Sequence, residues 1–294
     1  MQSMTLLDEG KMFFEDRGQG KPILFLHGWG TCARFFENQV RSLEAEFRVV
    51  VPDLRGHGAS SALPEGDEIH TLACDVQQLL EHLDLKDVVI CGWSMGSMVL
   101  WDLLLKIGSD RIERCVVIDM TPKLENDSDW VFGLLHKPRT YVTAGKREVD
   151  KSIWNAACES FLPKIYAKGT SSATEANGQL KAGFDWAIEQ ARKCDPDSMY
   201  RLWNNLLSMD FRDCMSKLKF PVLLLYGEQS QLYGSGTSAW LDEHLPQARR
   251  IAFAHSGHAL HLEESEKFNK EVAAFANAGG GSHVRNNTPA GEPH

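Results

Sequence analysis

Residues 92–96, Gly-Trp-Ser-Met-Gly, carry the clearest indication of chemistry in the chain, a serine between two glycines. An apolar run typical of a buried strand precedes them, and an almost entirely apolar segment typical of a buried helix follows. This context predicts a sharp strand-to-helix turn that exposes the serine hydroxyl. Because a serine hydroxyl is a weak nucleophile at neutral pH, the turn needs a histidine that accepts its proton. The sequence therefore predicts a nucleophilic Ser94.

Three further motifs follow predicted strands, and they stand in a fixed order with the first. They are His-Gly-Trp-Gly at 27–30, Pro-Asp-Leu-Arg-Gly-His-Gly-Ala-Ser at 52–60 and Ser-Gly-His-Ala-Leu-His-Leu-Glu at 256–263. Together the four motifs resemble the H-G-x-x, D-x-R-G-x-G-x-S, G-x-S-x-G and G-H-x-x-x-x-E patterns of the α/β-hydrolase superfamily. The resemblance extends from residue 21 to residue 276.

The resemblance implies a role for each matching position. Ser94 is the expected nucleophile, and His258, in a loop after the last predicted strand, is the expected proton acceptor. The backbone N–H groups of Met95 and Trp29 are expected to form the oxyanion hole, which leaves both side chains free to line an acyl pocket. His261 is the alternative histidine, although we expect it to pack against or cap the following helix.

The acid of the triad departs from the family pattern. The family usually places an aspartate a few residues after the next-to-last strand, where this chain has Ser230. A neutral hydroxyl cannot stabilise an imidazolium by charge, so another carboxylate must act or the site is a dyad. We favour Asp119, which ends a predicted strand 25 positions after Ser94 and resembles the alternative acid site of haloalkane dehalogenases. Glu228 is the alternative acid.

Two other sets of polar residues are assigned no catalytic role. In the resembling family the loop that carries Asp53, Arg55 and His57 is mainly architectural, and we expect the same here. Cys32 lies near the expected oxyanion loop but has no evident basic partner, so a nucleophilic thiol is not expected there.

The motifs require a sheet to position them. Apolar and alternating runs predict strands, listed by residue number: 11–16, 22–26, 48–51, 88–91, 114–118, 221–226 and 250–253. Helical patterns fall between most of them, at 34–46, 70–83, 95–107, 237–244 and 264–276. This alternation predicts the α/β-hydrolase fold, a mostly parallel twisted sheet flanked by helices.

One long segment interrupts the alternation. Residues 121–213 show several helical patterns without a strong strand, and we interpret them as an inserted helical cap on a core formed by residues 1–120 and 214–278. The cap contains four tryptophans that together indicate an apolar pocket: Trp130, Trp154, Trp186 and Trp203. Residues 279–294 have almost no apolar content and are expected to be disordered.

The amino-acid composition and net charge limit the kinds of molecule that we expect the protein to bind. The chain has 43% hydrophobic residues and a net charge of -9, from 31 Lys and Arg against 40 Asp and Glu. This charge argues against binding to nucleic acid or anionic membranes and favours a small-molecule substrate. Neither a leader-like segment nor a membrane span is recognisable, and the seven cysteines show no paired spacing, so we expect a cytoplasmic protein with reduced thiols. No cofactor or metal is expected, because the histidines lack metal-site spacing.

The most natural activity is hydrolysis of a carboxylic ester, thioester or lactone of a small, partly apolar molecule through an acyl-enzyme. Residues 92–96 also resemble the turn of cofactor-free haloperoxidases, which are esterases with perhydrolase activity, and residues 27–30 resemble methyl-ester esterases of the pimeloyl type. A carbon–carbon bond hydrolase, a perhydrolase and a non-catalytic ligand-binding protein of the same fold are the alternatives. Dehalogenases and epoxide hydrolases use a carboxylate nucleophile, which does not fit a serine.

Overall fold

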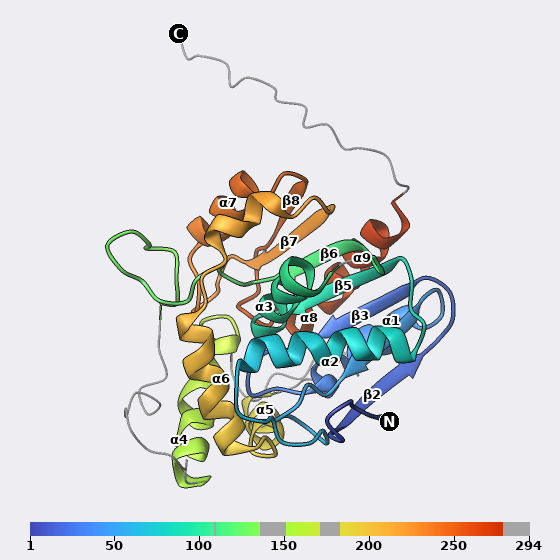
Figure 1. Ribbon diagram of the computed structural model, residues 1–294. Helices are drawn as coiled ribbons and strands as arrows, with labels where there is room; N and C mark the ends of the chain where they lie inside the picture. Colours follow the sequence, from blue (N-terminus) through green and yellow to red (C-terminus); the bar gives the residue numbers. More distant parts are fainter. Residues whose placement is uncertain (109, 136–150, 171–182, 279–294) are drawn as a thin grey trace.

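The computed structural model describes residues 1–108, 110–135, 151–170 and 183–278 (Figure 1). The expected disorder of residues 279–294 lies outside the described residues. An eight-stranded sheet forms the centre, in the order β1-β2-β4-β3-β5-β6-β7-β8. The strands are β1 (Gln2–Thr5), β2 (Lys11–Arg17), β3 (Pro22–Leu26), β4 (Arg48–Pro52), β5 (Val88–Trp93), β6 (Ile112–Ile118), β7 (Val222–Gly227) and β8 (Ala248–Phe253). The pairs β1–β2 and β2–β4 are antiparallel and the rest are parallel, which confirms the predicted fold class.

The helices lie on both faces of this sheet. They are α1 (Glu37–Leu43), α2 (Glu68–His82), α3 (Met95–Asp102), α4 (Lys151–Phe161), α5 (Phe184–Ala191), α6 (Pro196–Ser208), α7 (Ser235–His244), α8 (Leu260–Glu263) and α9 (Ser265–Asn277). Short 3-10 turns are η1 (Ala33–Phe36), η3 (Leu162–Ile165) and η4 (Arg212–Lys217), and the π-helical turn η2 (Leu103–Ile107) continues α3. Helices α2 and α3 pack together on one face, and α1 and α9 pack together on the other (Figure 1).

The centre of the sheet is buried on both sides. Every residue of β5 is buried, and four of the five residues of β3 and of β4 are buried. Continuous apolar runs are what a parallel strand with helices on both faces requires. Strand β1 was not predicted, because at the sheet edge only one of its four residues, Met4, is buried.

The register of the central strands brings their carboxyl ends to one level. Gly92 of β5 pairs with Leu26 of β3, and Trp93 of β5 pairs with Ile118 of β6. The residues that follow these strands therefore meet at the same edge of the sheet, where open α/β folds place their binding sites.

Residues 121–213, called the insertion below, leave the sheet after β6 and return before β7. Their described part contains α4, α5, α6 and η3, together with isolated bridges but no strand. Helices α4, α5 and α6 gather beside one end of the sheet (Figure 1). The indole N–H of Trp154 on α4 donates to the carbonyl of Ala191 at the end of α5, at 2.9 Å. The backbone N–H of Ile69 on α2 donates to Asn205 on α6 at 2.9 Å, which attaches the insertion to the core.

Candidate active site

Ser94 occupies the turn between β5 and α3. It is half-buried and has φ 54° and ψ -123°, a conformation that a residue with a side chain rarely adopts. Its backbone N–H donates to the Ile118 carbonyl at 3.1 Å. The turn requires Gly96, because a Cβ at this position would lie 2.2 Å from the Leu26 carbonyl oxygen. The sequence motif thus encodes a tight, strained turn that presents Ser94 at the sheet edge.

The loop after β3 passes directly beside Ser94. A Cβ added to Gly28 would lie 3.1 Å from the Ser94 Cβ, so the backbone before Trp29 runs next to the serine. The neighbouring His27 holds this loop in place, since its Nε2 accepts a hydrogen bond from the Leu54 N–H at 3.0 Å. Burial lowers the pKa of His27, which keeps the imidazole neutral and able to accept that bond.

The Trp29 side chain packs into a cluster of aromatic rings from the insertion. Its ring centroid lies 5.2 Å from that of Trp154, 5.5 Å from that of Phe161 and 4.9 Å from that of Trp203. Its indole N–H donates to the Met199 carbonyl at 2.9 Å. The loop expected to supply an oxyanion donor is therefore attached to the insertion through its own side chain.

Only two of the four tryptophans of the insertion belong to this aromatic cluster. Trp130 instead contacts Phe132 and Trp240, and Trp186 contacts Phe35. The ring contacts thus divide the four tryptophans between different parts of the structure, and the apolar pocket expected from them stays a prediction. Tryptophan content shows that a segment buries aromatic surface, but it does not show which helix face each ring lies on.

The loop at 52–60 is held by bonds within itself, to the start of η1 and to helix α2. The two Asp53 oxygens accept from the backbone N–H groups of Ala33 and Ala59, both at 2.8 Å. The Arg55 guanidinium donates two hydrogen bonds to the Asp75 carboxylate in a bidentate ion pair, both at 2.6 Å. These contacts agree with the predicted architectural role. Burial raises the pKa of the nearby Cys32 thiol to about 12, so its thiolate is scarce at neutral pH.

Asp119 and His258 meet at the sheet edge. The Nδ1 of His258 lies 2.7 Å from Oδ2 of Asp119, and both side chains are buried. With Nδ1–H as the donor, the other ring nitrogen is left as an acceptor. The Asp119 backbone, at φ 42°, is fixed by its N–H to the Leu225 carbonyl at 2.8 Å. Of the two carboxylates considered, Asp119 is the one brought to His258, whereas the Glu228 side chain is exposed.

Ser230 contributes to the same cluster in a way that sequence reasoning missed. Its hydroxyl donates to Oδ2 of Asp119 at 2.8 Å, so it supports the carboxylate instead of replacing it. Tyr233 was also missed. Its ring centroid lies 5.5 Å from that of His258, and burial, with the Asp119 charge, raises its pKa and keeps the phenol neutral. In the sequence, the position of Ser230 and Tyr233 just after the predicted strand that becomes β7 is the feature that could have indicated their place in the site.

The backbone of the loop that carries His258 packs directly against two other backbone segments. A Cβ at Gly257 would lie 2.4 Å from the Tyr166 carbonyl carbon of the insertion, and a Cβ at Gly227 would lie 2.0 Å from the Gly257 carbonyl oxygen. The indole N–H of Trp93 donates to the His258 carbonyl at 2.9 Å. The end of β7, the histidine loop and the insertion thus form three closely packed layers.

Gly257→Ala is therefore expected to lower the free energy of unfolding by about 3 kcal/mol, because backbone on both sides must move to admit one methyl group. The control is Gly234→Ala, since a Cβ there meets nothing within 4 Å. Urea unfolding of both variants measures the difference. Equal stability of the two variants would contradict this packing.

His261 is fully buried, as a packing role requires, but neither of its ring nitrogens has a hydrogen-bond partner among the described residues. Its ring lies 4.7 Å from that of Phe36 and 4.5 Å from that of Trp93. Burial, and the nearby His258, lower its pKa well below the ordinary value of 6.5. Below about pH 6.5 the unfolded chain binds a proton at His261 while the folded chain does not, so the free energy of unfolding decreases as the pH falls.

His261→Leu should remove this penalty. Relative to the original chain, the slope of unfolding free energy against pH below 6.5 should fall by up to about 1.4 kcal/mol per pH unit, the value for one proton. Urea titrations at half-unit steps from pH 7 to pH 5 measure both slopes. Parallel curves would show that His261 does not carry the effect.

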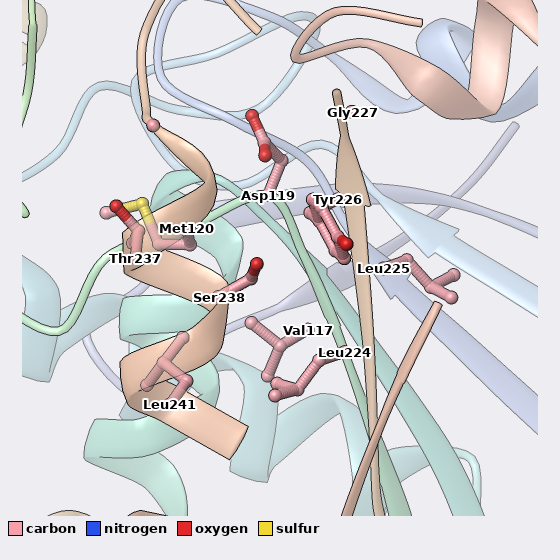
Figure 2. A pocket seen from close by; sticks show the side chains of 11 residues that line it. Val117, Asp119, Met120, Leu224, Leu225, Tyr226, Gly227, Thr237, Ser238 and Leu241 are labelled. Carbon is pink, nitrogen blue, oxygen red and sulfur yellow. The ribbon is translucent and has the colours of Figure 1, made fainter. Parts of the chain in front are cut away.

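A small cavity lies between the ends of β6 and β7 and helix α7 (Figure 2). Figure 2 shows Asp119 and Gly227 at its upper end and Thr237 and Ser238 on α7 at its side. Its volume of about 10 Å³ is room for roughly one water molecule. The cavity is too small for an ester, so it is not a substrate site.

Among the described residues, no group of three or more His, Cys, Asp or Glu side chains is placed to hold a metal ion. Each of the seven cysteines is a free thiol. None of the described helices is long and apolar enough to cross a membrane.

The chain is similar to a known protein family and to several known sequences. The family model described as α/β hydrolase fold matches residues 21–265. The pimeloyl-[acyl-carrier protein] methyl ester esterase of Vibrio campbellii is 31% identical over 265 residues, covering 90% of this chain and 98% of that protein. The AB hydrolase superfamily protein YisY of Bacillus subtilis is 25% identical over 282 residues, covering 91% and 96%.

Solved structures match over a similar length. An esterase from Exiguobacterium antarcticum superposes with a TM-score of 0.82 at 23% identity, over 94% of this chain and 99% of that one. A bromoperoxidase from Bacillus anthracis superposes with a TM-score of 0.80 at 25% identity, over 92% and 96%. At these identities the likeness concerns the fold.

Proposed function

Since the chain belongs to the α/β hydrolase fold family, we propose that it is a serine hydrolase that cleaves carboxylic esters through an acyl-enzyme. The observation that carries the proposal is the 2.7 Å contact between His258 and Asp119 at the sheet edge where the strained turn presents Ser94. Esterases among the relatives support the same reaction class.

In the proposed acylation step, Ser94 Oγ attacks the ester carbonyl carbon while Nε2 of His258 takes the hydroxyl proton. Asp119 accepts the Nδ1–H of His258, which fixes the tautomer and stabilises the imidazolium. Ser230, bonded to the same carboxylate oxygen, holds that oxygen in place. His258 then protonates the leaving alkoxide, and the alcohol departs.

The carbonyl oxygen becomes an oxyanion during this attack. The backbone N–H groups of Met95 and Trp29 are the proposed donors, each worth roughly 3 kcal/mol of transition-state stabilisation. Deacylation repeats the sequence with water as the nucleophile and His258 as its base, which releases the acid and restores Ser94.

The proposed substrate is a small ester with an apolar part. The insertion is the proposed cap, because its aromatic rings Trp154, Phe161 and Trp203 pack around Trp29 and so place the insertion beside the expected oxyanion loop. Similarity to a pimeloyl-[acyl-carrier protein] methyl ester esterase supports an ester with a small alcohol part. The free thiols support a reducing, cytoplasmic location.

Perhydrolysis is the second candidate, favoured by the likeness to a bromoperoxidase at 25% identity. On the same residues, hydrogen peroxide would replace water in deacylation and release a peracid. A peroxide-dependent bromination assay with an acetate donor separates the two, because a plain esterase releases acid only.

The first test is labelling with a fluorophosphonate, which reports an activated serine without knowledge of the substrate. We expect stoichiometric modification, located by mass spectrometry on the peptide that contains Ser94 and absent from Ser94→Ala. A folded protein that resists labelling would refute the proposal and favour a ligand-binding role.

A further inference from the structure

The Glu263 carboxylate bridges two segments that are distant in sequence. Its Oε1 accepts from the backbone N–H of Ala167 at 2.8 Å and from the Thr170 hydroxyl at 3.3 Å, both in the insertion. Its Oε2 accepts from the backbone N–H of Gly257 at 2.7 Å, next to His258. Ala167 and Glu263 are 96 positions apart. One side chain therefore joins the insertion to the histidine loop.

Other contacts make the same connection. The backbone N–H of Ala259, on the other side of His258, donates to the Ile165 carbonyl of the insertion at 2.7 Å. Gly257 packs so closely against the Tyr166 backbone that there is no space between the two segments for a side chain. The backbone on both sides of His258 is thus held by bonds that depend on where residues 165–170 lie.

We propose that Glu263 is a positioning residue, whose two oxygens hold the histidine loop against residues 165–170 so that the insertion sets the position of His258. The inference rests on the proposed function, because it assigns His258 as the base. Proton transfer between Ser94 and His258 requires the two side chains to be placed to within about 1 Å of their reactive positions. In this proposal Glu263, which is not a member of the triad, holds His258 in that position.

The chemistry of the bridge makes the inference specific. Each Glu263 oxygen faces a backbone N–H, and a carboxylate can accept at both ends. A glutamine has one oxygen and one NH₂ group, so one of the two N–H groups would face another donor. Burial raises the pKa of Glu263, while the hydrogen bonds from the Ala167 and Gly257 N–H groups lower it. These two bonds therefore compensate for part of the cost of burying the carboxylate.

The test compares Glu263→Gln with Glu264→Gln. Glu264 also contacts the histidine loop, but a single oxygen, Oε2, accepts from both the His255 N–H and the Ser256 hydroxyl, so an amide can keep both bonds. The readouts are kcat and KM for p-nitrophenyl acetate, the rate of fluorophosphonate labelling, and the low-field proton resonance of the His258 Nδ1–H shared with Asp119.

For Glu263→Gln we expect kcat and the labelling rate to fall about 100-fold, KM to stay within about threefold, and the low-field resonance to be lost by exchange with water. Glu264→Gln should stay within about threefold in every readout. If the wild-type chain is labelled at Ser94 and Glu263→Gln matches it within threefold, the positioning role is overturned. If the wild-type chain is not labelled, the proposed function fails first.

Glu263→Asp covers the case in which the glutamine variant does not fold. It keeps the charge but shortens the reach by one methylene group, so it cannot span Ala167 and Gly257 together. We expect a loss of kcat of at least about tenfold in a variant that stays folded by circular dichroism. Activity within threefold of the wild-type value would overturn the proposal.

Discussion

Ser94→Ala is expected to lower kcat for p-nitrophenyl acetate by roughly 10⁵- to 10⁶-fold, the loss seen when the nucleophile of a serine triad is removed. Without the hydroxyl no acyl-enzyme forms, and only the oxyanion donors and binding contacts assist a direct attack by water. The fold should persist, because the hydrogen bonds of Ser94 with Ile118 and Ser97 are made by its backbone, and its side chain is only half-buried. Initial rates and a thermal melt measure both effects.

Ser97 provides a matched control three residues along the same turn. It is fully buried, and its hydroxyl donates to the Gly92 carbonyl at 2.6 Å, so it supports the turn from inside. Ser97→Ala should cost about 1 kcal/mol of stability and less than tenfold in kcat. Retention of more than a hundredth of the activity by Ser94→Ala would exclude the acyl-enzyme route.

The sequence was sufficient to predict seven of the eight strands that the structure describes, all except β1, and the residues at the sheet edge. The central strands β3 and β5 were recognisable because buried parallel strands are continuous apolar runs, and here each ends where a motif begins. Ser94 and Asp119 follow two such strands, and the Trp93–Ile118 pairing then places them side by side. Helix 95–107 was predicted as one unit, whereas α3 ends at Asp102 and continues as the π-turn η2, a change in hydrogen bonding that apolar periodicity does not reveal.

The contacts made by the insertion could not be predicted. The aromatic cluster combines Trp29 with Trp154 and Trp203, and the Glu263 bridge joins α8 to Ala167. Such contacts depend on how helices from distant positions dock, which local periodicity does not determine. The Ser230 bond to Asp119 was missed for a different reason: the two residues follow the adjacent strands β7 and β6, but Ser230 was considered only as a replacement for the acid and not as its partner.

Asp119→Asn is the second large expected effect, a loss of about 10⁴-fold in kcat with little change in fold. The asparagine amide can turn its NH₂ group toward Nδ1 of His258 and favour the tautomer with its proton on Nε2. That tautomer cannot accept the Ser94 proton, and the neutral amide cannot stabilise an imidazolium. Stopped-flow measurement of the acylation burst would locate the loss in the step that forms the acyl-enzyme.

Glu228→Gln separates the two carboxylates that the sequence left open. The Glu228 side chain is exposed and reaches solvent, so the change should leave kcat within about twofold. If the outcome is reversed, with Glu228→Gln inactive and Asp119→Asn active, the chain must move Glu228 to His258 when substrate binds. If both single variants stay active and the double variant does not, either carboxylate can serve. Only a large loss confined to Asp119→Asn is compatible with the hydrogen bond between Asp119 and His258 acting in catalysis as it stands.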